Sequence, residues 1–343
     1  MDNDAYCHES KTRVAYPDWM ASVSGSKRIN RMSLPGTHDT MAKPPHGGDA
    51  AICQSMTLSE QLLAGIRALD IRLRACGNGF AIHHGPVYLH ANFDDVLRYT
   101  NAFLDAHPKE FVLIKLKKEK EACGDDSDAR FKRNFQTAMR NHGGRVFKPA
   151  YYGKFPTLDQ VRGKIVILTH GSARYDGVYS ISYGTNAYGP VVLKMRQGKA
   201  RCGKARWELR TNWDLYGHYL DTQDDFKKVS EVFGSNNTDD YWTSNIGGST
   251  GSFPYFVASG HSSPGTHAPR LSTGLVDGIS AGASKWPDFP RVACFMSWCT
   301  IAFEGVNELS AKKIRSGAYP NGIGLTFWDF PGAGLIKLII DLN

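Results

Sequence analysis

Two histidines beside turn-forming residues are the first candidates for chemistry in this sequence. His38 lies in Ser33–Thr40 (SLPGTHDT), where Pro35 and Gly36 predict an abrupt turn after a short strand. His84 ends the apolar run FAIHH and precedes a second turn. Two imidazoles at separate strand ends could cleave a phosphodiester, since one removes a proton from the attacking hydroxyl while the other protonates the leaving oxygen. Taken alone, the first motif is equally explained by a histidine that caps a turn.

The second motif holds two adjacent histidines, His83 and His84, before Gly85 and Pro86. Neighbouring side chains on a strand point to opposite faces, so only one of the two can face the interior of a barrel. His84 is the better candidate for proton transfer because it ends the predicted strand.

Charged residues elsewhere could position these rings and stabilise a phosphoryl transition state. Asp39 directly follows the first histidine, and Asp329 lies between two aromatic residues, where a carboxylate could orient an imidazole and fix its proton. Asp70 and Arg72 share one face of a predicted strand, and a guanidinium fork matches phosphate oxygens. A purely structural ion pair between Asp70 and Arg72 is the alternative.

The elements that must position these residues alternate between strand and helix. The candidate strands are residues 68–74, 80–84, 111–117, 164–170 and 322–330. Thr57–Ile66 opens with a capping box, and a second amphipathic helix runs from Asn92 to a stop at Pro108. This alternation predicts a parallel sheet with outer helices, and the length favours one closed α/β barrel over 1–343. Gly- and Ser-rich compositions predict long loops at 171–190 and 259–284.

The net charge of +8 favours approach to anionic surfaces such as phospholipid head groups or nucleic acid. The absence of a basic tail, a zinc-finger spacing and a basic zipper makes nucleic acid the poorer partner. A soluble protein with a merely basic surface is the alternative. No apolar stretch approaches the roughly 20 residues that span a bilayer, so membrane contact is expected to be peripheral.

The cysteines suggest an oxidising compartment rather than a zinc site, because no C-x-x-C pair occurs. Several disulfides are plausible, although the odd count leaves a thiol unpaired and buried reduced cysteines explain the same data. The sequon at Asn236 is compatible with export, whereas the sequence as given carries no secretory signal. We expect a secreted protein. The seven cysteines are Cys7, Cys53, Cys76, Cys123, Cys202, Cys294 and Cys299.

The motifs LPGTHDT, LDIR, HHGPVYL, LKKE and WDF occur in the order found in bacterial-type phosphatidylinositol-specific phospholipases C. The sequence resembles that family over nearly its whole length. The resemblance implies a distorted, incomplete (β/α)8 barrel of TIM type, no cofactor, and phosphatidylinositol or its glycosylated forms at a membrane surface as the partner. In that family the inositol 2-hydroxyl attacks phosphorus, which releases diacylglycerol and inositol 1,2-cyclic phosphate.

The resemblance also implies roles for individual residues. His38 would be the general base, oriented by Asp329, and His84 the general acid, paired with Asp39. Arg72 would stabilise the phosphoryl oxygens. Calcium-dependent relatives carry an acidic residue at the position of Arg72 that helps to hold the metal, so this sequence looks like a metal-free version.

Four further positions relate to the substrate through the same resemblance. Lys117 matches a lysine near the substrate, and Asp214 with Tyr216 resembles an Asp-x-Tyr pair that binds the inositol hydroxyls and stacks on the ring. His170 stands where the family has an arginine that contacts inositol, which leaves the head-group preference open. Nothing in the sequence indicates an oligomeric state. Aromatic residues that could enter a bilayer interface, or belong to the core, are Trp242, Phe253, Tyr255 and Phe256.

Three other classes of function stay open. A metal-dependent glycerophosphodiesterase or sphingomyelinase D on a similar barrel would carry an E-x-D pattern where this sequence ends the triplet in Arg72. A lipid-binding module without turnover would keep the barrel and lose a catalytic histidine. Nucleic-acid cleavage by two histidines shares the chemistry but not the motifs.

Overall fold

The computed structural model describes most of the chain. The described residues are 5–12, 14–119, 123–124, 127–148, 155–170, 179–183, 192–197, 213–235, 241–247, 254–259, 290–295, 298–303 and 305–343.

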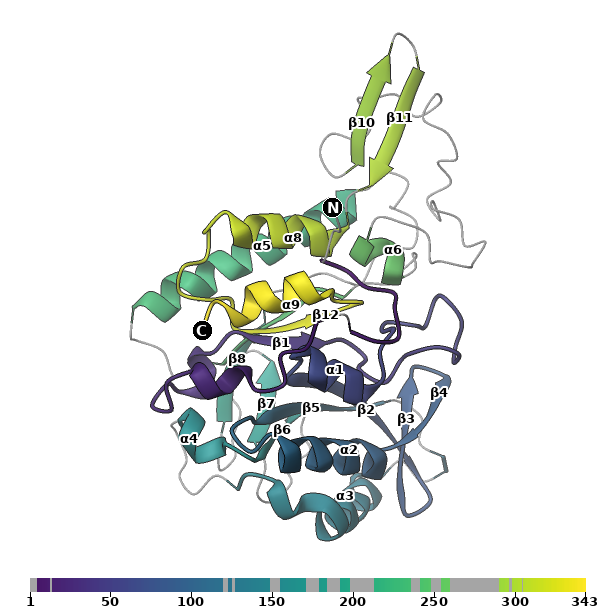
Figure 1. Cartoon of the computed structure of the whole chain (residues 1–343). Coiled ribbons are helices and arrows are strands. Elements are labelled where there is room, and N and C mark those ends of the chain that lie inside the picture. Colours follow the sequence, from purple (N-terminus) through teal and green to yellow (C-terminus); the bar gives the residue numbers. More distant parts are fainter. Residues whose placement is uncertain are drawn as a thin grey trace.

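Within the described ranges, eight parallel strands form the centre of the molecule (Figure 1). The first strand, β1, pairs with both β12 and β2, so the ring of strand pairings is closed. The expected α/β barrel is therefore confirmed. Around the ring the strands are β1 (Leu34–Thr37), β12 (Leu325–Trp328), β9 (Tyr241–Asn245), β8 (Val192–Gln197), β7 (Tyr179–Tyr183), β6 (Ile165–His170), β5 (Val112–Lys118) and β2 (Ala68–Cys76).

Helices cover the outside of the ring. Figure 1 shows α2 and α3 on one side and α5, α8 and α9 on the other. The connections 171–178 and 184–191 are shorter than the dozen or so residues that a helical crossover takes, which makes the barrel irregular. The helices are α1 (Leu58–Ala64), α2 (Phe93–Ala106), α3 (Asp128–His142), α4 (Leu158–Val161), α5 (Trp213–Gly234), α6 (Pro254–Ser259), α8 (Val306–Arg315) and α9 (Ala333–Ile340).

The helical signals in the sequence are confirmed at both predicted helices. The hydroxyl of Thr57 accepts a hydrogen bond from the backbone of Glu60 at 3.3 Å and caps α1. Asn92 and Asp95 form a reciprocal capping box at the start of α2. All five predicted strands also exist, with shifts of a few residues at their ends.

The turn predicted at Pro35 and Gly36 is wrong. Pro35 and Gly36 lie inside β1 rather than in a turn, and the chain turns at Asp39, whose φ is +42°. Gly36 is needed because β1 is squeezed between two strands: a Cβ would lie 2.6 Å from the carbonyl oxygen of Thr326 and 2.7 Å from Cβ of Ala68.

The predicted loop at 171–190 contains β7, a short alternating segment that the surrounding Gly and Ser residues obscure. The predicted loop at 259–284 lies outside the described residues except for Ser259, which ends α6.

The FAIHH segment forms β3 (Gly79–His84), which is not a barrel strand. It runs antiparallel to β2 and continues the sheet with antiparallel β4 (Val87–Asn92). The tight connection uses Gly77, whose φ of +54° suits glycine. Because β2 extends beyond the ring and β3 folds back along it, His84 returns toward the edge at which β1 and β12 end. The strands β10 (Pro290–Phe295) and β11 (Trp298–Phe303) pair with each other in a separate hairpin.

Residues spaced by two along the ring strands fill its interior in layers. Leu34, Ala68, Leu113, Val166 and Leu325 belong to one buried apolar cluster. Two residues further along, β2 and β5 carry an ion pair in place of apolar contacts. Another two residues bring each strand to its C-terminal edge, where the candidate residues of the site begin.

Candidate active site

His38 directly follows β1 and is buried. Its Nδ1 lies 2.8 Å from Oδ1 of Asp329, and its Nε2 lies 2.6 Å from Nη2 of Arg72. Because a carboxylate accepts and a guanidinium donates, a neutral ring with its proton on Nδ1 satisfies both contacts. Nε2 then keeps the lone pair that a general base needs.

His84 reaches the same edge from the antiparallel arm. Its Nε2 lies 3.3 Å from Oδ2 of Asp39, and its Nδ1 donates to the carbonyl oxygen of Ala51 at 2.8 Å. Oδ2 of Asp39 is also 3.6 Å from Nε2 of His38, so both rings face one carboxylate. Their centroids are 6.4 Å apart and their planes nearly perpendicular. His83, by contrast, is buried beside Tyr88.

Arg72 joins the two histidine pairs. Its Nε lies 2.7 Å from Oδ1 of Asp39, Nη2 is 3.5 Å from Asp70, and Nη1 is 3.6 Å from Glu119. The ion pair with Asp70 that the sequence suggests therefore exists, but Asp39 is the nearer partner. Burial lowers the pKa of Arg72, yet the attraction of Asp39 and Asp70 outweighs it and raises the pKa. The guanidinium stays charged.

Lys115 and Asp70 form a buried ion pair next to Arg72, one layer deeper in the barrel. Nζ of Lys115 lies 3.2 Å from Oδ1 of Asp70 and 4.4 Å from the centre of the Phe327 ring. Oδ2 of Asp70 accepts from the backbone N–H of Asp39 at 3.3 Å and so helps to fix the turn. Burial raises the pKa of Asp70, but Lys115 and Arg72 outweigh it and lower the pKa overall. Sequence reasoning missed Lys115, although its spacing of two from Lys117 places both on one face.

Burial and charge oppose each other at the proposed base. Burial lowers the pKa of His38, but the attraction of Asp329 and Asp39 outweighs it and raises the pKa above its ordinary value. Burial also raises the pKa of Asp39, and Arg72, His38 and His84 offset this only in part. His38 and Asp39 therefore hold a proton more tightly than isolated side chains of their kind would.

Two residues that no sequence motif indicated help to position His38. Nε2 of Gln54 donates to the carbonyl oxygens of His38 at 2.7 Å and Trp328 at 2.9 Å, which ties the ends of β1 and β12 together. Gly247 follows β9, and a Cβ there would lie 2.8 Å from both Nδ1 of His38 and Oδ2 of Asp329. Only glycine leaves room for that pair, and no local signal in the sequence marks the position.

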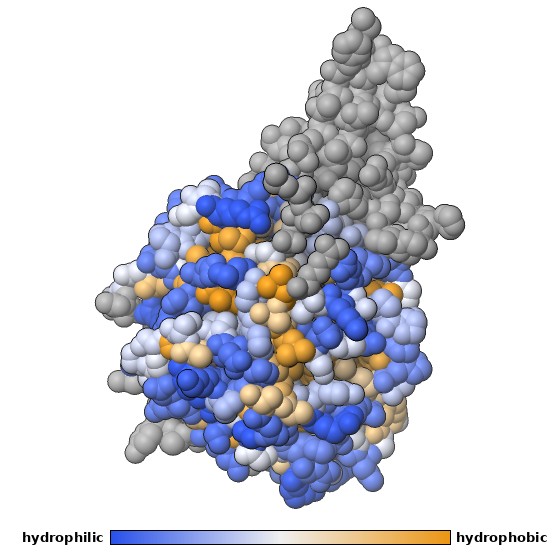
Figure 2. All heavy atoms as spheres, in the orientation of Figure 1, coloured by the Kyte–Doolittle hydropathy of each residue, from blue (hydrophilic) through white to orange (hydrophobic). Residues whose placement is uncertain are grey.

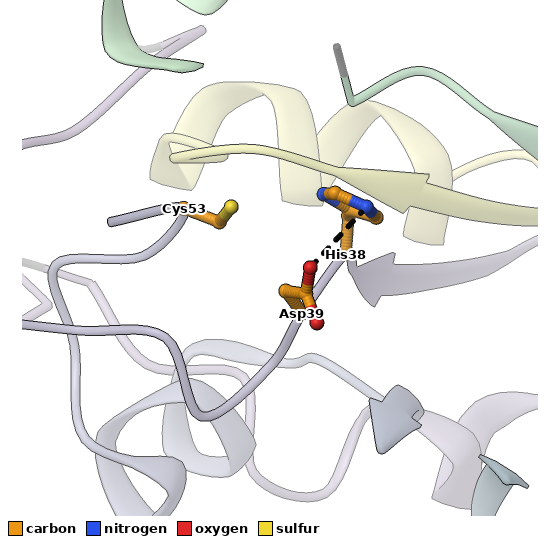
Figure 3. A group of neighbouring side chains, drawn as sticks. All are labelled: His38, Asp39 and Cys53. Carbon is orange, nitrogen blue, oxygen red and sulfur yellow. Dashed lines mark ion pairs between the residues drawn. The ribbon is translucent and has the colours of Figure 1, made fainter. Parts of the chain in front are cut away.

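A buried cysteine lies against the same residues. Figure 3 shows Cys53 on a segment beside His38 and Asp39. Its Sγ is 4.0 Å from Nδ1 of His84. Burial raises the pKa of the Cys53 thiol well above its ordinary value, and Asp329 and Asp39 raise it further. The thiolate, which is the nucleophilic form of cysteine, is therefore disfavoured at Cys53.

Of the four predicted substrate-binding residues, only Lys117 has a side chain that the structure describes. Nζ of Lys117 lies 3.7 Å from Glu119 at the edge of the barrel, and its side chain is 40% exposed. His170 is the last residue of β6, while Asp214 and Tyr216 lie in the first turn of α5. The side chains of these three residues lie outside the described part of the chain.

The fold and the site together define an α/β barrel with two carboxylate-paired imidazoles and a guanidinium at one edge, an arrangement suited to acid–base chemistry on a phosphodiester. The family model "Phosphatidylinositol-specific phospholipase C, X domain" matches residues 48–171. The 1-phosphatidylinositol phosphodiesterase of Listeria monocytogenes is 34% identical over 179 residues, which cover 48% of this chain and 52% of the relative. The chain thus spans about half the length of that relative.

Other relatives and solved structures agree. The 1-phosphatidylinositol phosphodiesterase of Staphylococcus aureus is 29% identical over 66% of this chain and 71% of its own length. The solved structure of the Listeria phosphatidylinositol-specific phospholipase C superposes with a TM-score of 0.59 at 22% identity, covering 96% of this chain and 99% of that one. A Staphylococcus aureus structure gives 0.63 at 19% identity, covering 95% and 97%. The chain is therefore related to the bacterial-type phosphatidylinositol-specific phospholipases C, which confirms the resemblance noted in its motifs.

Proposed function

We propose that this chain is a metal-independent phosphatidylinositol-specific phospholipase C that forms diacylglycerol and inositol 1,2-cyclic phosphate. One observation carries the proposal: the His38–Asp329 and His84–Asp39 pairs face each other beside Arg72. The family match supports the substrate class. The chain would act as one catalytic barrel over its whole length.

His38 would act as the general base. Its proton on Nδ1 is held by Asp329, so Nε2 can accept the proton of the inositol 2-hydroxyl as that oxygen attacks phosphorus. In the structure Nη2 of Arg72 lies 2.6 Å from this nitrogen and donates to its lone pair. Substrate binding must therefore shift the guanidinium from His38 to the phosphoryl oxygens.

His84 would act as the general acid. When its Nε2 carries a proton, the ring pairs with Asp39, and this proton passes to the departing oxygen of diacylglycerol. Arg72 would stabilise the charge that builds on the phosphoryl oxygens, because its planar fork matches two of them. The cyclic ester forms as the bond from phosphorus to the glycerol oxygen breaks.

The inositol ring would bind beyond the acid–base pair. Lys117 reaches the barrel edge from β5, next to Arg72 in strand register, and would contact the head group. His170, Asp214 and Tyr216 would complete the subsite, with His170 in place of an arginine. Phosphatidylinositol and its glycosylated forms are both candidate substrates.

The enzyme would meet its lipid as a peripheral, secreted protein. No helix among the described residues is long and apolar enough to cross a membrane. The face in Figure 2 is mostly hydrophilic over the described residues, with hydrophobic residues gathered in a narrow seam. Trp242 and Tyr255 are buried, which favours the core interpretation for both, while the side chains of Phe253 and Phe256 lie outside the described part. The disulfide between Cys76 and Cys123 fits an oxidising compartment.

The test is lipid cleavage in the presence of excess chelator. Phosphatidylinositol vesicles are incubated with the protein, and inositol cyclic phosphate and diacylglycerol are measured. We expect turnover by the natural sequence and a loss of about 10²–10⁴-fold in His38→Ala and His84→Ala, the contribution of a positioned acid or base. His142→Ala, which removes a histidine at the end of α3, is the matched control and should keep full activity.

Two results would contradict the proposal. Activity that disappears with chelator would favour the metal-dependent rival, despite Arg72 at the position where that class carries a metal ligand. Lipid binding without any product would favour a binding module.

A further inference from the structure

The buried carboxylates of the site outnumber its permanent cations. Asp39, Asp70 and Asp329 are each 2% exposed, whereas only Arg72 and Lys115 carry fixed positive charge among the described residues in direct contact with them. Because the cluster is buried, its charges are poorly screened by water.

Three of the buried side chains offer the atoms that a metal ion binds. One ligand atom each of His38, Asp39 and Cys53 lies within 4.8 Å of the other two. All three residues are buried. Figure 3 shows them as neighbouring side chains near the start of the segment that follows β1. Oδ2 of Asp39 is buried and lies 3.3 Å from Nε2 of His84 and 3.6 Å from Nε2 of His38, so a metal ion at this oxygen would take the place of imidazole contacts.

The backbone holds Cys53 against the other two residues. Its N–H donates to the carbonyl oxygen of Ala42 at 2.8 Å, and its own carbonyl accepts from the N–H of Phe330 at 3.0 Å. The cysteine is therefore tied both to the segment after Asp39 and to the end of the last barrel strand. These two backbone hydrogen bonds fix the position of Cys53 relative to His38.

From this geometry we propose that His38, Asp39 and Cys53 form a binding site for a thiophilic divalent cation such as Zn²⁺ or Cd²⁺. One nitrogen, one carboxylate oxygen and one sulfur make a ligand set that zinc accepts, with a fourth position left for water. Tetrahedral bond lengths of about 2.0–2.3 Å require these atoms to approach to roughly 3.3–3.7 Å of one another, a small side-chain movement. The thiol proton leaves to solvent as the metal–sulfur bond forms.

Occupancy of this site would stop phosphodiester cleavage, an effect that rests on the proposed function. The metal would take a nitrogen of His38 and release its contact with Arg72 or Asp329. It would also take the carboxylate of Asp39, to which His84 and Arg72 are both paired. An enzyme that needs no metal would therefore be inhibited by zinc and cadmium. Hard cations such as Mg²⁺ and Ca²⁺ should have no effect, because they prefer oxygen ligands.

The first experiment detects the metal without using activity. Cd²⁺ is titrated into the full-length protein without reducing agent, and the ultraviolet charge-transfer absorption of a cadmium–thiolate bond is followed. We expect a band that saturates in the natural sequence and is lost in Cys53→Ser. Cys53→Ala serves as a second variant, with circular dichroism confirming that each variant is folded. Cys7→Ser, which alters another described cysteine, should keep the band.

The second experiment measures inhibition of lipid turnover by Zn²⁺, with each variant compared to its own metal-free rate. Cys53→Ser should need at least roughly 10–100-fold more Zn²⁺ for half inhibition, the size of loss seen for ligand-shell changes. A band or a zinc sensitivity that persists unchanged in folded Cys53→Ser and Cys53→Ala would overturn the proposal, as would activation by zinc. Should the protein cleave no lipid yet lose the cadmium band in both variants, the metal site stands and the proposed function fails.

Discussion

At the scale of single residues, the two histidines differ in what their ring nitrogens face. His38 has a carboxylate at Nδ1 and a guanidinium at Nε2, so its neutral form satisfies both neighbours. His84 has a carbonyl oxygen at Nδ1 and a carboxylate near Nε2, so a proton on each nitrogen is matched by an acceptor. The two rings, 6.4 Å apart, thus have the surroundings that the proposed base and the proposed acid require.

The pKa of His38 gives a prediction for the pH dependence of kcat/KM. A general base must be unprotonated, and the pKa of His38 is raised because Asp329 and Asp39 outweigh burial. Activity should therefore rise with pH through a midpoint above 6.5, the ordinary value. In Asp329→Asn the lost charge should move this midpoint to lower pH. The maximal rate should fall by about 10²-fold or more, since the amide no longer fixes the tautomer.

The control for this measurement is Asp159→Asn, which alters a carboxylate that is 68% exposed and paired with Arg162. Its pH profile should match that of the natural sequence. An acid limb that stays in place in Asp329→Asn would show that another group titrates there.

Motifs in the sequence pointed to residues that the structure places close together. The sequence placed His38, Asp39, Arg72, His84 and Asp329 in one site, and the structure brings these five together although their roles stay proposals. Gly247, Gln54 and Cys53 were missed because each acts through contacts with distant parts of the chain. A glycine that leaves room for a side chain 200 residues away leaves no local pattern.

At the scale of elements, the period of two along a strand links the core to the site. On β2 and β5, Ala68 and Leu113 lie in the apolar layer, and Asp70 and Lys115 pair directly above them. Arg72 then follows at the edge. The register of neighbouring parallel strands thus determines which charged side chains lie within contact distance. The turn after each strand then has to position only the residue that follows the strand.

The closure of the ring at β1 predicts a large effect of Gly36→Ala. The added Cβ would lie 2.6 Å from the backbone oxygen of Thr326 and 2.8 Å from that of Ala68, so both neighbouring strands would have to move. We expect a loss of about 1–3 kcal/mol in the free energy of unfolding, as for other overpacked interiors. The measurement is urea unfolding followed by circular dichroism.

Gly79→Ala is the matched control, because this glycine also lies in a strand but no heavy atom comes within 4 Å of a Cβ built there. Its unfolding free energy should stay within about 0.5 kcal/mol of the natural sequence. Equal destabilisation by both substitutions would mean that glycine at position 36 does not serve strand packing.

The elements predicted least well are those whose structure depends on contacts with neighbouring strands rather than on a local sequence pattern. The FAIHH run has the composition of a barrel strand, yet the tight turn at Gly77 makes it an antiparallel arm. Pro35 and Gly36 suggest a turn until the crowding between β12 and β2 is known. Helices with capping residues and apolar periodicity, such as α1 and α2, were predicted closely because their signals are local.

At the scale of the whole molecule, the barrel depends on contacts between the two ends of the chain. β1 pairs with β12, whose residues lie about 290 positions later, and the side chain of Asn343 bonds to the backbone of Ser33. Gln54 adds a further link between His38 and Trp328. His38 and Asp329 are brought together only when this long-range closure forms, so the His38–Asp329 pair and the fold should be lost in one transition.

The disulfide between Cys76 and Cys123 allows a test of how strongly the other side of the barrel is tied. It closes a loop of 47 residues between the end of β2 and the segment after β5. Chain-entropy arguments assign about 4 kcal/mol to a loop of this length. The double variant Cys76→Ser/Cys123→Ser should therefore unfold at a lower urea concentration. Its free energy of unfolding should be lower by roughly 4 kcal/mol. A reducing agent should lower the stability of the natural sequence by a similar amount and that of the double variant much less. If the reducing agent leaves the stability of the natural sequence unchanged, the Cys76–Cys123 disulfide does not stabilise the fold.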